Sequence, residues 1–247
     1  DGACRNRHCI GSETCPNLNT SHDDYLKLLR EIRSVKGVKK VFVRSGLRYD
    51  YVLADHNKAF VKELCQYHVS GQLKVAPEHV VKHVTDLMGK ADVHAFLKFK
   101  DWFDEANREL GKKQYLVPYF MSSHPGCTLK DAVALAEFLR DMHMQPEQVQ
   151  DFIPTPGSLS TAMYYTGLNP LTGEKVYVAR SQEEKRRQKS YFFNEKPTGN
   201  PTVPERRTTA RQERAPKNYR PNGDRTSAPR PRKGENPRAI PGIKRKR

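Results

Sequence analysis

The chain has 247 residues and carries 44 Lys and Arg against 28 Asp and Glu, so its formal net charge is +16. Residues 196–247 hold 16 of the basic residues and 4 of the acidic ones, so the remainder is an ordinary, mildly basic chain. No apolar run approaches the roughly 18–20 residues of a membrane span, and the start, DGACRNRHCIG, lacks the apolar region of a secretory signal. Five cysteines, an odd number, favour a reducing cytoplasm over a disulfide framework.

Three helical regions are predicted before residue 111. The first follows residue 20 and ends at Gly37, and the second covers 56–69. A third region is expected to break near Gly89, and its second part, 92–110, is rich in aromatic residues. Apolar residues recur at helical spacing along the first helix, at Tyr25, Leu28, Leu29, Ile32 and Val35.

Four short strands are predicted between helices, beginning at Val38, Leu73, Tyr115 and Val149. Because a helix occupies every gap between them, the sheet should be parallel, with right-handed crossovers. Four strands do not close a barrel, so part of a (β/α) barrel is the expected α/β architecture.

Each predicted strand ends in a polar turn. The strand 115–120 runs into the turn 122–126, after which Thr128 and Asp131 have the spacing of a capping box at the start of a helix. The other turns are 45–48, 77–79 and 154–158. In parallel α/β proteins ligands bind at such turns, beyond the C-terminal ends of the strands. We therefore expect the functional site on this rim.

The turns supply residues that suit a small polar ligand with an amino-acid end and a ribose end. Arg48 can pair with a carboxylate, Glu78 can accept from an ammonium group or ribose hydroxyls, and Gly126 and Gly157 allow close approach of backbone. The alternative is that each is an ordinary turn or rim residue. The candidate cofactor-binding residues are Ser45, Arg48, Glu78, His79, Ser122, Ser123, His124, Gly126, Pro156 and Gly157.

Six strings in this order, CPNLNT, SGLRYD, LKVAPEH, QYLVPYF, SSHPG and TAMYYTGLNPL, resemble the YgiQ-type branch of the radical S-adenosylmethionine (SAM) enzymes over about residues 1–193. HPGCTLKD resembles the strand-5 signature of that superfamily, and FIPTPGSLSTAMY its strand-6 segment. The resemblance implies a TIM-like partial barrel, SAM as cofactor and a [4Fe-4S] cluster. It also implies that Glu78 and the turns 122–124 and 156–157 line the SAM and substrate side.

The cluster motif of that superfamily, CxxxCxxC, is absent from this sequence. In the family it lies upstream of the stretch that this chain resembles, so the resemblance implies the C-terminal part of such an enzyme, with iron ligands outside the chain. We expect uncovered strand edges and helix faces, and therefore association. The substrate is not named by the sequence. Two alternatives stay open: an RNA-binding accessory protein and an inactive fragment of a split gene.

An N-terminal Cys-rich loop, residues 1–20, precedes the barrel part at 21–180. Cys4, Cys9 and Cys15 can bind zinc or an auxiliary iron–sulfur cluster, with His8 nearby. The alternative is three thiols without a metal.

A C-terminal helix at 181–195 is expected to lead into a disordered tail at 196–247. The tail interleaves Arg and Lys with Pro and Gly and has few large apolar residues. This composition favours binding to RNA or the ribosome through phosphates. The alternative is an extension that aids solubility.

Overall fold

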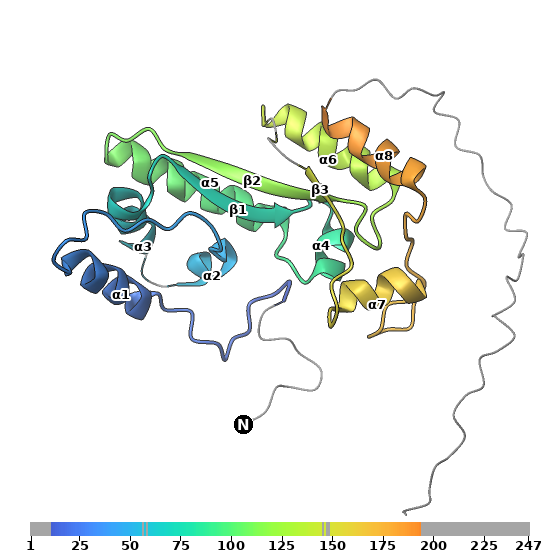
Figure 1. Ribbon diagram of the computed structural model, residues 1–247, viewed down its shortest axis with the longest axis horizontal. Helices are drawn as coiled ribbons and strands as arrows, with labels where there is room; N and C mark the ends of the chain where they lie inside the picture. The colour runs from blue at the N-terminus through green and yellow to red at the C-terminus, as the bar shows by residue number, and fades with distance from the viewer. Residues whose placement is uncertain (1–10, 56, 58, 145, 147–148, 194–247) are drawn as a thin grey trace, which may run out of the picture. The chain divides into compact units, whose positions relative to one another are not determined.

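The fold is built on a parallel three-stranded sheet (Figure 1). The computed structural model describes residues 11–55, 57, 59–144, 146 and 149–193. In these residues the strands are β1 (Gln72–Glu78), β2 (Tyr115–Ser122) and β3 (Val149–Asp151), hydrogen-bonded in the order β1-β2-β3. Leu73 lies opposite Leu116, and Phe120 opposite Val149. The predicted alternation of helices with parallel strands is confirmed.

The predicted strand at 38–43 is wrong. Residues 38–44, the edge segment, run extended near β1 without strand pairing. Val43 N–H donates to the carbonyl of His68 (2.8 Å), and Lys74 N–H of β1 donates to the carbonyl of Arg44 (2.9 Å). Phe42 keeps 42% of its surface exposed. Single bonds to two different neighbours do not make a ladder, so the apolar run stays irregular.

Within the described residues, ten helical elements surround the sheet, and their ends follow the sequence signals. Helix α6 begins with the predicted capping box, in which Thr128 and Asp131 exchange hydrogen bonds. Helix α4 ends at Gly89, whose φ of 64° is left-handed. No helix in the described part of the chain has the length and apolar character to cross a membrane. The elements are α1 (Asp23–Ser34), α2 (Tyr49–Ala54), α3 (Ala59–Glu63), π-helix η1 (Leu64–His68), α4 (Lys82–Met88), α5 (Val93–Glu109), α6 (Leu129–Asp141), α7 (Leu159–Thr166), α8 (Gln182–Ser190) and 3-10 helix η2 (Tyr191–Phe193).

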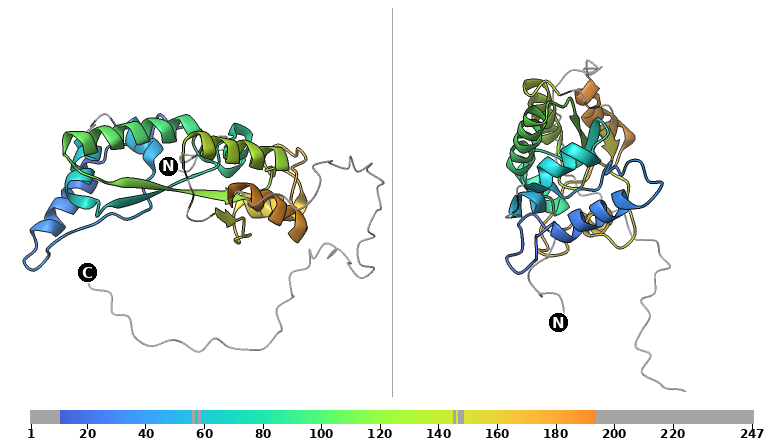
Figure 2. Two further views of the ribbon diagram at one scale, coloured as in Figure 1. Left: turned by 90° about the horizontal axis from the view of Figure 1, so that it is seen from above. Right: turned by 90° about the vertical axis from the view of Figure 1, so that its left-hand side faces the viewer.

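One face of the sheet is covered by α5 and α6, which follow one another along the strands (Figure 2). Helix α5 places Phe96, Phe99 and Phe103 in a core cluster with Leu73 and Val75 of β1. Helix α6 forms a second cluster with Phe120, Val149 and Phe192. The aromatic spacing of α5 puts three rings on one stripe of the helix, which fixes that helix on β1.

The opposite face of the sheet is only half covered. Lys74 and Ala76 of β1 and Val117 and Tyr119 of β2 are each partly exposed. Lys74 lies opposite Val117, and its ammonium is 5.3 Å from the centre of the Tyr119 ring, so these side chains share one face. The sheet therefore has a helical layer on one side and an open surface on the other.

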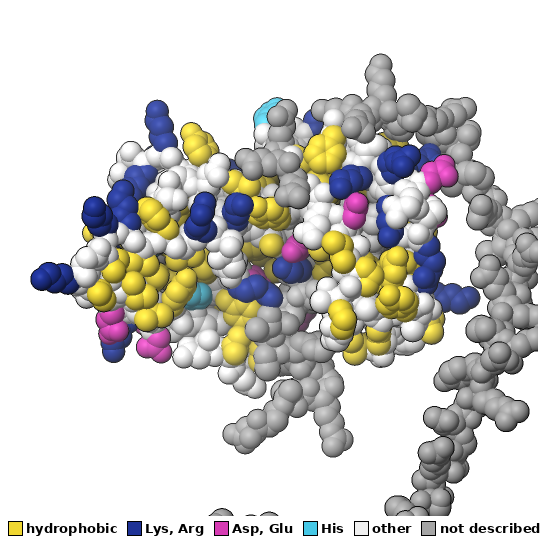
Figure 3. Space-filling view, viewed as in Figure 1, with side chains coloured by type: hydrophobic (Ala, Val, Ile, Leu, Met, Phe, Trp, Pro, Cys, Tyr) yellow, Lys and Arg dark blue, Asp and Glu magenta, His cyan; other side chains and the backbone are white. Residues whose placement is uncertain are grey.

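Helix α1 buries only part of its apolar surface. Leu26 and Leu29 are buried, whereas Leu28 is 51% and Val35 56% exposed. Apolar side chains gather over α1 in the space-filling view (Figure 3). The apolar spacing identified the helix correctly. Leu29 is the one of the five apolar residues at that spacing that is buried, and Tyr25 keeps a ring contact with Phe60 of α3.

Candidate functional site

Turns that follow β1, β2 and β3 meet at the C-terminal ends of the strands. Cys127, after β2, has its sulfur 3.5 Å from Nε2 of His79, which follows β1. His124 is 2.8 Å from the hydroxyl of Ser160, on the helix that follows β3. These contacts join three turns that are far apart in the sequence.

The turn after β1 carries a strained carboxylate and a buried imidazole. Glu78 has φ = 67°, which is uncommon for a residue other than glycine, and its carboxylate is 3.4 Å from Lys90. Burial raises the pKa of Glu78, and Lys90 opposes that shift. His79 accepts a hydrogen bond at Nδ1 from Val81 N–H (3.1 Å), and burial lowers its pKa to about 4. The imidazole is therefore neutral at pH 7 and carries its proton on Nε2.

The turn after β2 is also strained and buried. Ser123 has φ = 60°, and Ser122, Ser123 and His124 are all almost fully buried. His124 Nδ1 lies 2.7 Å from the carbonyl of Pro125 and so donates to it, which leaves Nε2 to accept from Ser160. Burial lowers the pKa of His124 to about 4. This second imidazole is neutral and fixed in the opposite tautomer to His79.

Gly126 closes the same turn where no side chain fits. Its φ is 92°, and an added Cβ would lie 2.2 Å from Cδ1 of Leu87. Its N–H donates to the carbonyl of Tyr177 (2.7 Å). The glycine therefore permits both the left-handed turn and close packing on α4.

Cys127 and Gln188 join the site, and sequence reasoning missed both. The sulfur of Cys127 lies 3.5 Å from Gln188 Oε1, as well as 3.5 Å from His79. Because His79 carries its proton on Nε2, it donates towards the sulfur, and the thiol donates towards Gln188. Burial raises the pKa of Cys127 to about 12. A neutral thiol beside a neutral imidazole is a structural pair and not an activated nucleophile.

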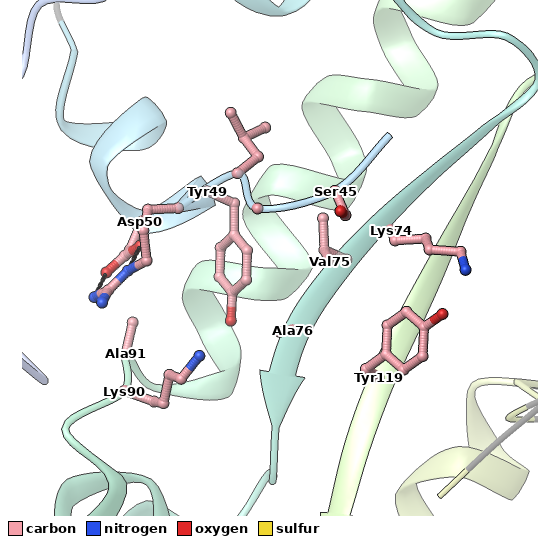
Figure 4. Close-up of a pocket in the computed structure, with 12 residues that line it drawn as sticks. Ser45, Tyr49, Asp50, Lys74, Val75, Ala76, Lys90, Ala91 and Tyr119 are labelled. Atoms are coloured by element: carbon pink, nitrogen blue, oxygen red, sulfur yellow. Dashed lines mark hydrogen bonds and ion pairs between the residues drawn. The ribbon is translucent and has the colours of Figure 1, made fainter. Parts of the chain in front are cut away.

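A first hollow, of about 180 Å³, lies between the turn at 45–48 and the open face of β1 (Figure 4). Arg48, Lys74 and Lys90 bring three cations to its wall. The guanidinium of Arg48 is held by Asp50, with Nε–Oδ1 at 2.9 Å and Nη2–Oδ2 at 2.5 Å. Tyr49 lies between Asp50 and β1. Since Asp50 occupies the fork of Arg48, a ligand carboxylate would compete for it.

A second hollow, of about 390 Å³, shares Arg48 and Lys90 with the first. Its wall includes Ser158 at the start of α7 and the apolar side chains of Leu159 and Met163. Pockets for small ligands have volumes of about 300–1,000 Å³, mostly apolar walls and a few placed polar groups. The second hollow meets that description, whereas the first is too small to hold a cofactor alone.

The predicted site residues fall into three groups: those at or next to the hollows, those exposed in a turn, and those buried beneath the rim. Ser45 and Arg48 line the first hollow, and Arg48 lines both. Pro156 and Gly157 are exposed in the turn before α7 and line neither hollow. Glu78 lines neither hollow, but its carboxylate lies 3.4 Å from Lys90, which lines both. The remaining candidates lie beneath the rim, with side chains or backbone covered: His79, Ser122, Ser123, His124 and Gly126.

The comparisons identify relatives of this chain but leave their function open. It is 56% identical over 189 residues to a protein of Clostridium perfringens named UPF0313 protein, covering 76% of this chain and 28% of the relative. A UPF0313 protein of Clostridium botulinum is 54% identical over 189 residues, which covers 76% of this chain and 29% of that relative. The family model "Domain of unknown function (DUF3362)" matches residues 147–213.

The chain has homologues named UPF0313 protein. It spans less than a third of the length of these curated relatives. The match to the domain of unknown function includes β3, α7 and α8, so it supplies Ser158, Ser160 and Gln188 to the site.

The N-terminal cysteines do not provide a complete metal site among the described residues. Cys15 is a free, buried thiol, and Cys4 and Cys9 lie outside the described residues. Residues 11–193, apart from the positions left undescribed, contain no group of three or more His, Cys, Asp or Glu arranged to hold a metal ion. A metal or cluster bound by Cys4, Cys9 and Cys15 stays a prediction, because two of these residues lie outside the described part of the chain.

Three functional-site residues gave different signals in the sequence. Lys90 follows Gly89, which ends α4. The glycine indicates a turn, but nothing in the local sequence indicates that Lys90 lies at a binding site. Cys127 immediately precedes the N-cap of α6, where an apolar residue is common, so its position did not indicate a site. Gln188 lies 61 residues beyond Cys127 and gave no local signal, because only the fold brings the two together.

Proposed function

We propose that this chain is the C-terminal part of a YgiQ-type radical SAM iron–sulfur enzyme and contributes its SAM-binding rim. The observation that carries the proposal is a pair of hollows that share Arg48 and Lys90: the first lies at the 45–48 turn, and the second includes Ser158 from the turn after β3. Ligand binding beyond the C-terminal ends of parallel strands is the general rule for such sheets. The substrate class stays open.

The second hollow offers groups that match the parts of SAM. Leu159, Met163 and Leu171 give an apolar wall for an adenine ring, and Ser158 and Asn169 give polar groups for ribose hydroxyls. These residues bind and orient, and they exclude water from one side of the ligand. Glu78, held by Lys90, places a carboxylate near the first hollow, where it can face a cationic ligand group.

A partial TIM-like barrel is the fold that we propose for the complete protein. The edge segment supports it, because it lies beside β1 without forming a ladder and further strands of a barrel wall join a sheet at its edge. The open face at Lys74 and Tyr119, opposite the helices, would then face the barrel interior. The matching relatives are more than three times as long as the matched stretch, which leaves room for those strands.

The [4Fe-4S] cluster of such an enzyme would supply the electron that cleaves SAM. Its ligands do not correspond to described residues of this chain, so no step of the chemistry is assigned to residues here. In our proposal this chain binds and orients SAM. His79 and His124, which are buried and neutral, support the turns beneath the ligand.

The decisive experiment is titration of SAM into the full chain by calorimetry. The same titration uses a chimera in which this chain replaces the matching 189-residue stretch of the C. perfringens relative. Leu159 is 43% exposed and lines the second hollow, so Leu159→Trp fills the hollow without disturbing the core. We expect this variant to weaken SAM binding by about tenfold or more.

Leu168→Trp is the matched control, because Leu168 is 41% exposed and lines neither hollow. Equal SAM affinity in the two variants would place the site elsewhere. Absence of SAM binding to both the chain and the chimera would contradict the proposal. With binding established, 5′-deoxyadenosine formation by the chimera under anaerobic, reducing conditions tests the reaction class.

A second function, binding of RNA through residues 196–247, is favoured by the 16 basic and 4 acidic residues in that stretch. Phosphate contacts release counterions, so binding should fall steeply as salt rises. A gel-shift experiment with and without residues 196–247 tests this. Equal binding by both chains, or affinity independent of salt, would exclude the tail as an RNA-binding element.

A further inference from the structure

The turn at 122–127 is bonded at five of its six residues by the segment that follows it from β3 to α8. Phe152 N–H donates to the carbonyl of Ser122 (2.9 Å), and Ser160 bonds to His124 (2.8 Å). The carbonyl of Tyr177 accepts from Gly126 N–H (2.7 Å). Gln188 bonds to both Ser123 and Cys127. Every one of these partners lies within residues 147–213, which match the domain of unknown function.

Gln188 is the contact that holds the turn at two points. Its Oε1 accepts from Ser123 N–H (3.1 Å), and its Nε2 donates to the carbonyl of Cys127 (2.9 Å). It is the buried residue of α8, with 1% of its surface exposed. Among its neighbours on the helix, Arg186 is exposed and Lys185 and Lys189 are half-buried. A single amide thus fixes the spacing between the two ends of the turn.

The turn needs such support because its backbone is strained. Ser123 holds φ = 60°, and its buried hydroxyl has no hydrogen-bond partner among the described residues. A left-handed conformation in a residue with a side chain costs on the order of 1–2 kcal/mol and persists where the surroundings impose it. Gln188 accepts a hydrogen bond from the N–H of Ser123, so it stabilises the strained backbone conformation of that residue.

We infer that Gln188 is a positioning residue, and that α8 of the domain of unknown function shapes the turn 122–127 for the ligand rim. Ser160 extends this role, since it bonds to His124 and its helix lines the second hollow. The inference rests on the proposed function for the identity of the ligand, SAM. It does not depend on SAM for the effect of α8 on the turn.

Hydrogen exchange of the full chain, resolved at the Ser123 amide, tests the inference. Gln188→Leu removes both bonds at similar volume, and we expect the Ser123 amide to exchange about tenfold faster or more, because a buried hydrogen bond is lost at each end of the turn. Gln182→Leu is the matched control, since Gln182 is exposed at the start of the same helix. The control should leave exchange unchanged.

Gln188→Glu provides a rescue that a merely space-filling role would not show. A neutral carboxyl can accept from Ser123 and donate to Cys127, as the amide does, whereas a carboxylate can only accept. Measured against the native chain at each pH, protection of the Ser123 amide should return to within about threefold at pH 5. At pH 8 the carboxylate still accepts from the Ser123 N–H but can no longer donate to the carbonyl of Cys127, so the melting temperature relative to the native chain should be lower at pH 8 than at pH 5. Burial favours the neutral form at the lower pH.

Each outcome decides the inference separately from the proposed function. Faster exchange confined to the turn in Gln188→Leu, with rescue by Gln188→Glu at pH 5, supports it even where SAM fails to bind. Where SAM binds, its affinity should fall in Gln188→Leu and not in Gln182→Leu. Unchanged exchange at Ser123, or an equal rise over the whole chain, would overturn it.

Discussion

Gly126 is the residue where turn geometry and packing meet most tightly. Its left-handed φ of 92° would strain any side chain, and Leu87 occupies the space that a Cβ would take. Gly157 has a similar φ of 80° but open space around it. Alanine at Gly157 would therefore lose stability through backbone strain alone, whereas alanine at Gly126 would lose it through strain and a steric clash.

We predict that Gly126→Ala lowers the free energy of unfolding by about 2–3 kcal/mol, and Gly157→Ala by about 1 kcal/mol. Urea denaturation of the two variants measures both values. In a Leu87→Ala background the cost of Gly126→Ala should fall by about 1 kcal/mol, because the clashing methyl group is gone. Equal costs for the two glycines, or full additivity with Leu87→Ala, would argue against this packing.

At the scale of elements, helix α1 carries two apolar stripes with different environments. Leu29 is 5% exposed and belongs to the main core cluster, whereas its neighbour Leu28 is 51% exposed. A contiguous exposed apolar face usually marks an interaction surface or promotes association. This face and the edge segment are where further strands and helices of a longer protein would pack in our proposal.

We predict that Leu28→Lys reduces self-association without lowering the melting temperature. Leu29→Lys should unfold the chain or destabilise it by more than about 3 kcal/mol, since it buries an unpaired charge. Light scattering and thermal denaturation measure the two effects. A native chain that is already a monodisperse monomer at high concentration would contradict the association that we expect.

The sequence predicted elements well where local pattern was sufficient. The strands at Leu73, Tyr115 and Val149 and the break at Gly89 are confirmed, because buried runs and a left-handed glycine are encoded locally. The edge segment has a similar apolar run, but a strand also requires a partner, which its own sequence does not supply. Helix α2, with six residues, was too short to show a helical period.

The candidate site was predictable as a rim but not as a set of contacts. Alternation of strands and helices brings the turns to one edge, and that inference needed no tertiary knowledge. Burial of His79 and the pairing of Arg48 with Asp50 depend on packing between distant segments. For the same reason the sequence did not reveal Gln188.

At the scale of the whole molecule, two buried neutral imidazoles link folding to pH. Burial lowers the pKa of His79 and of His124 to about 4, against an ordinary value of 6.5. Below pH 6.5 these two histidines become protonated in the unfolded chain, whereas in the folded chain they stay neutral until about pH 4. Stability is therefore present at neutral pH and lost as the pH falls through this window.

We predict that the free energy of unfolding drops between pH 7 and pH 5, with each histidine contributing up to about 1.4 kcal/mol per pH unit. His124→Asn should make this slope shallower by about 1 kcal/mol per pH unit near pH 5. His143→Asn is the control, because His143 is exposed and its φ of 52° suits asparagine. Urea titrations at several pH values give the slopes, and a flat profile would rule out this linkage.

The dependence of the 122–127 turn on α8 limits how far the chain can be shortened. Phe192 packs in the cluster with α6. Gln188, four residues before it, is hydrogen-bonded to the turn. Truncations meant to remove the basic extension should therefore stop after Phe193. A chain that ended before Gln188 but after β3 would keep the three described strands. It would lose the two hydrogen bonds that hold the 122–127 turn.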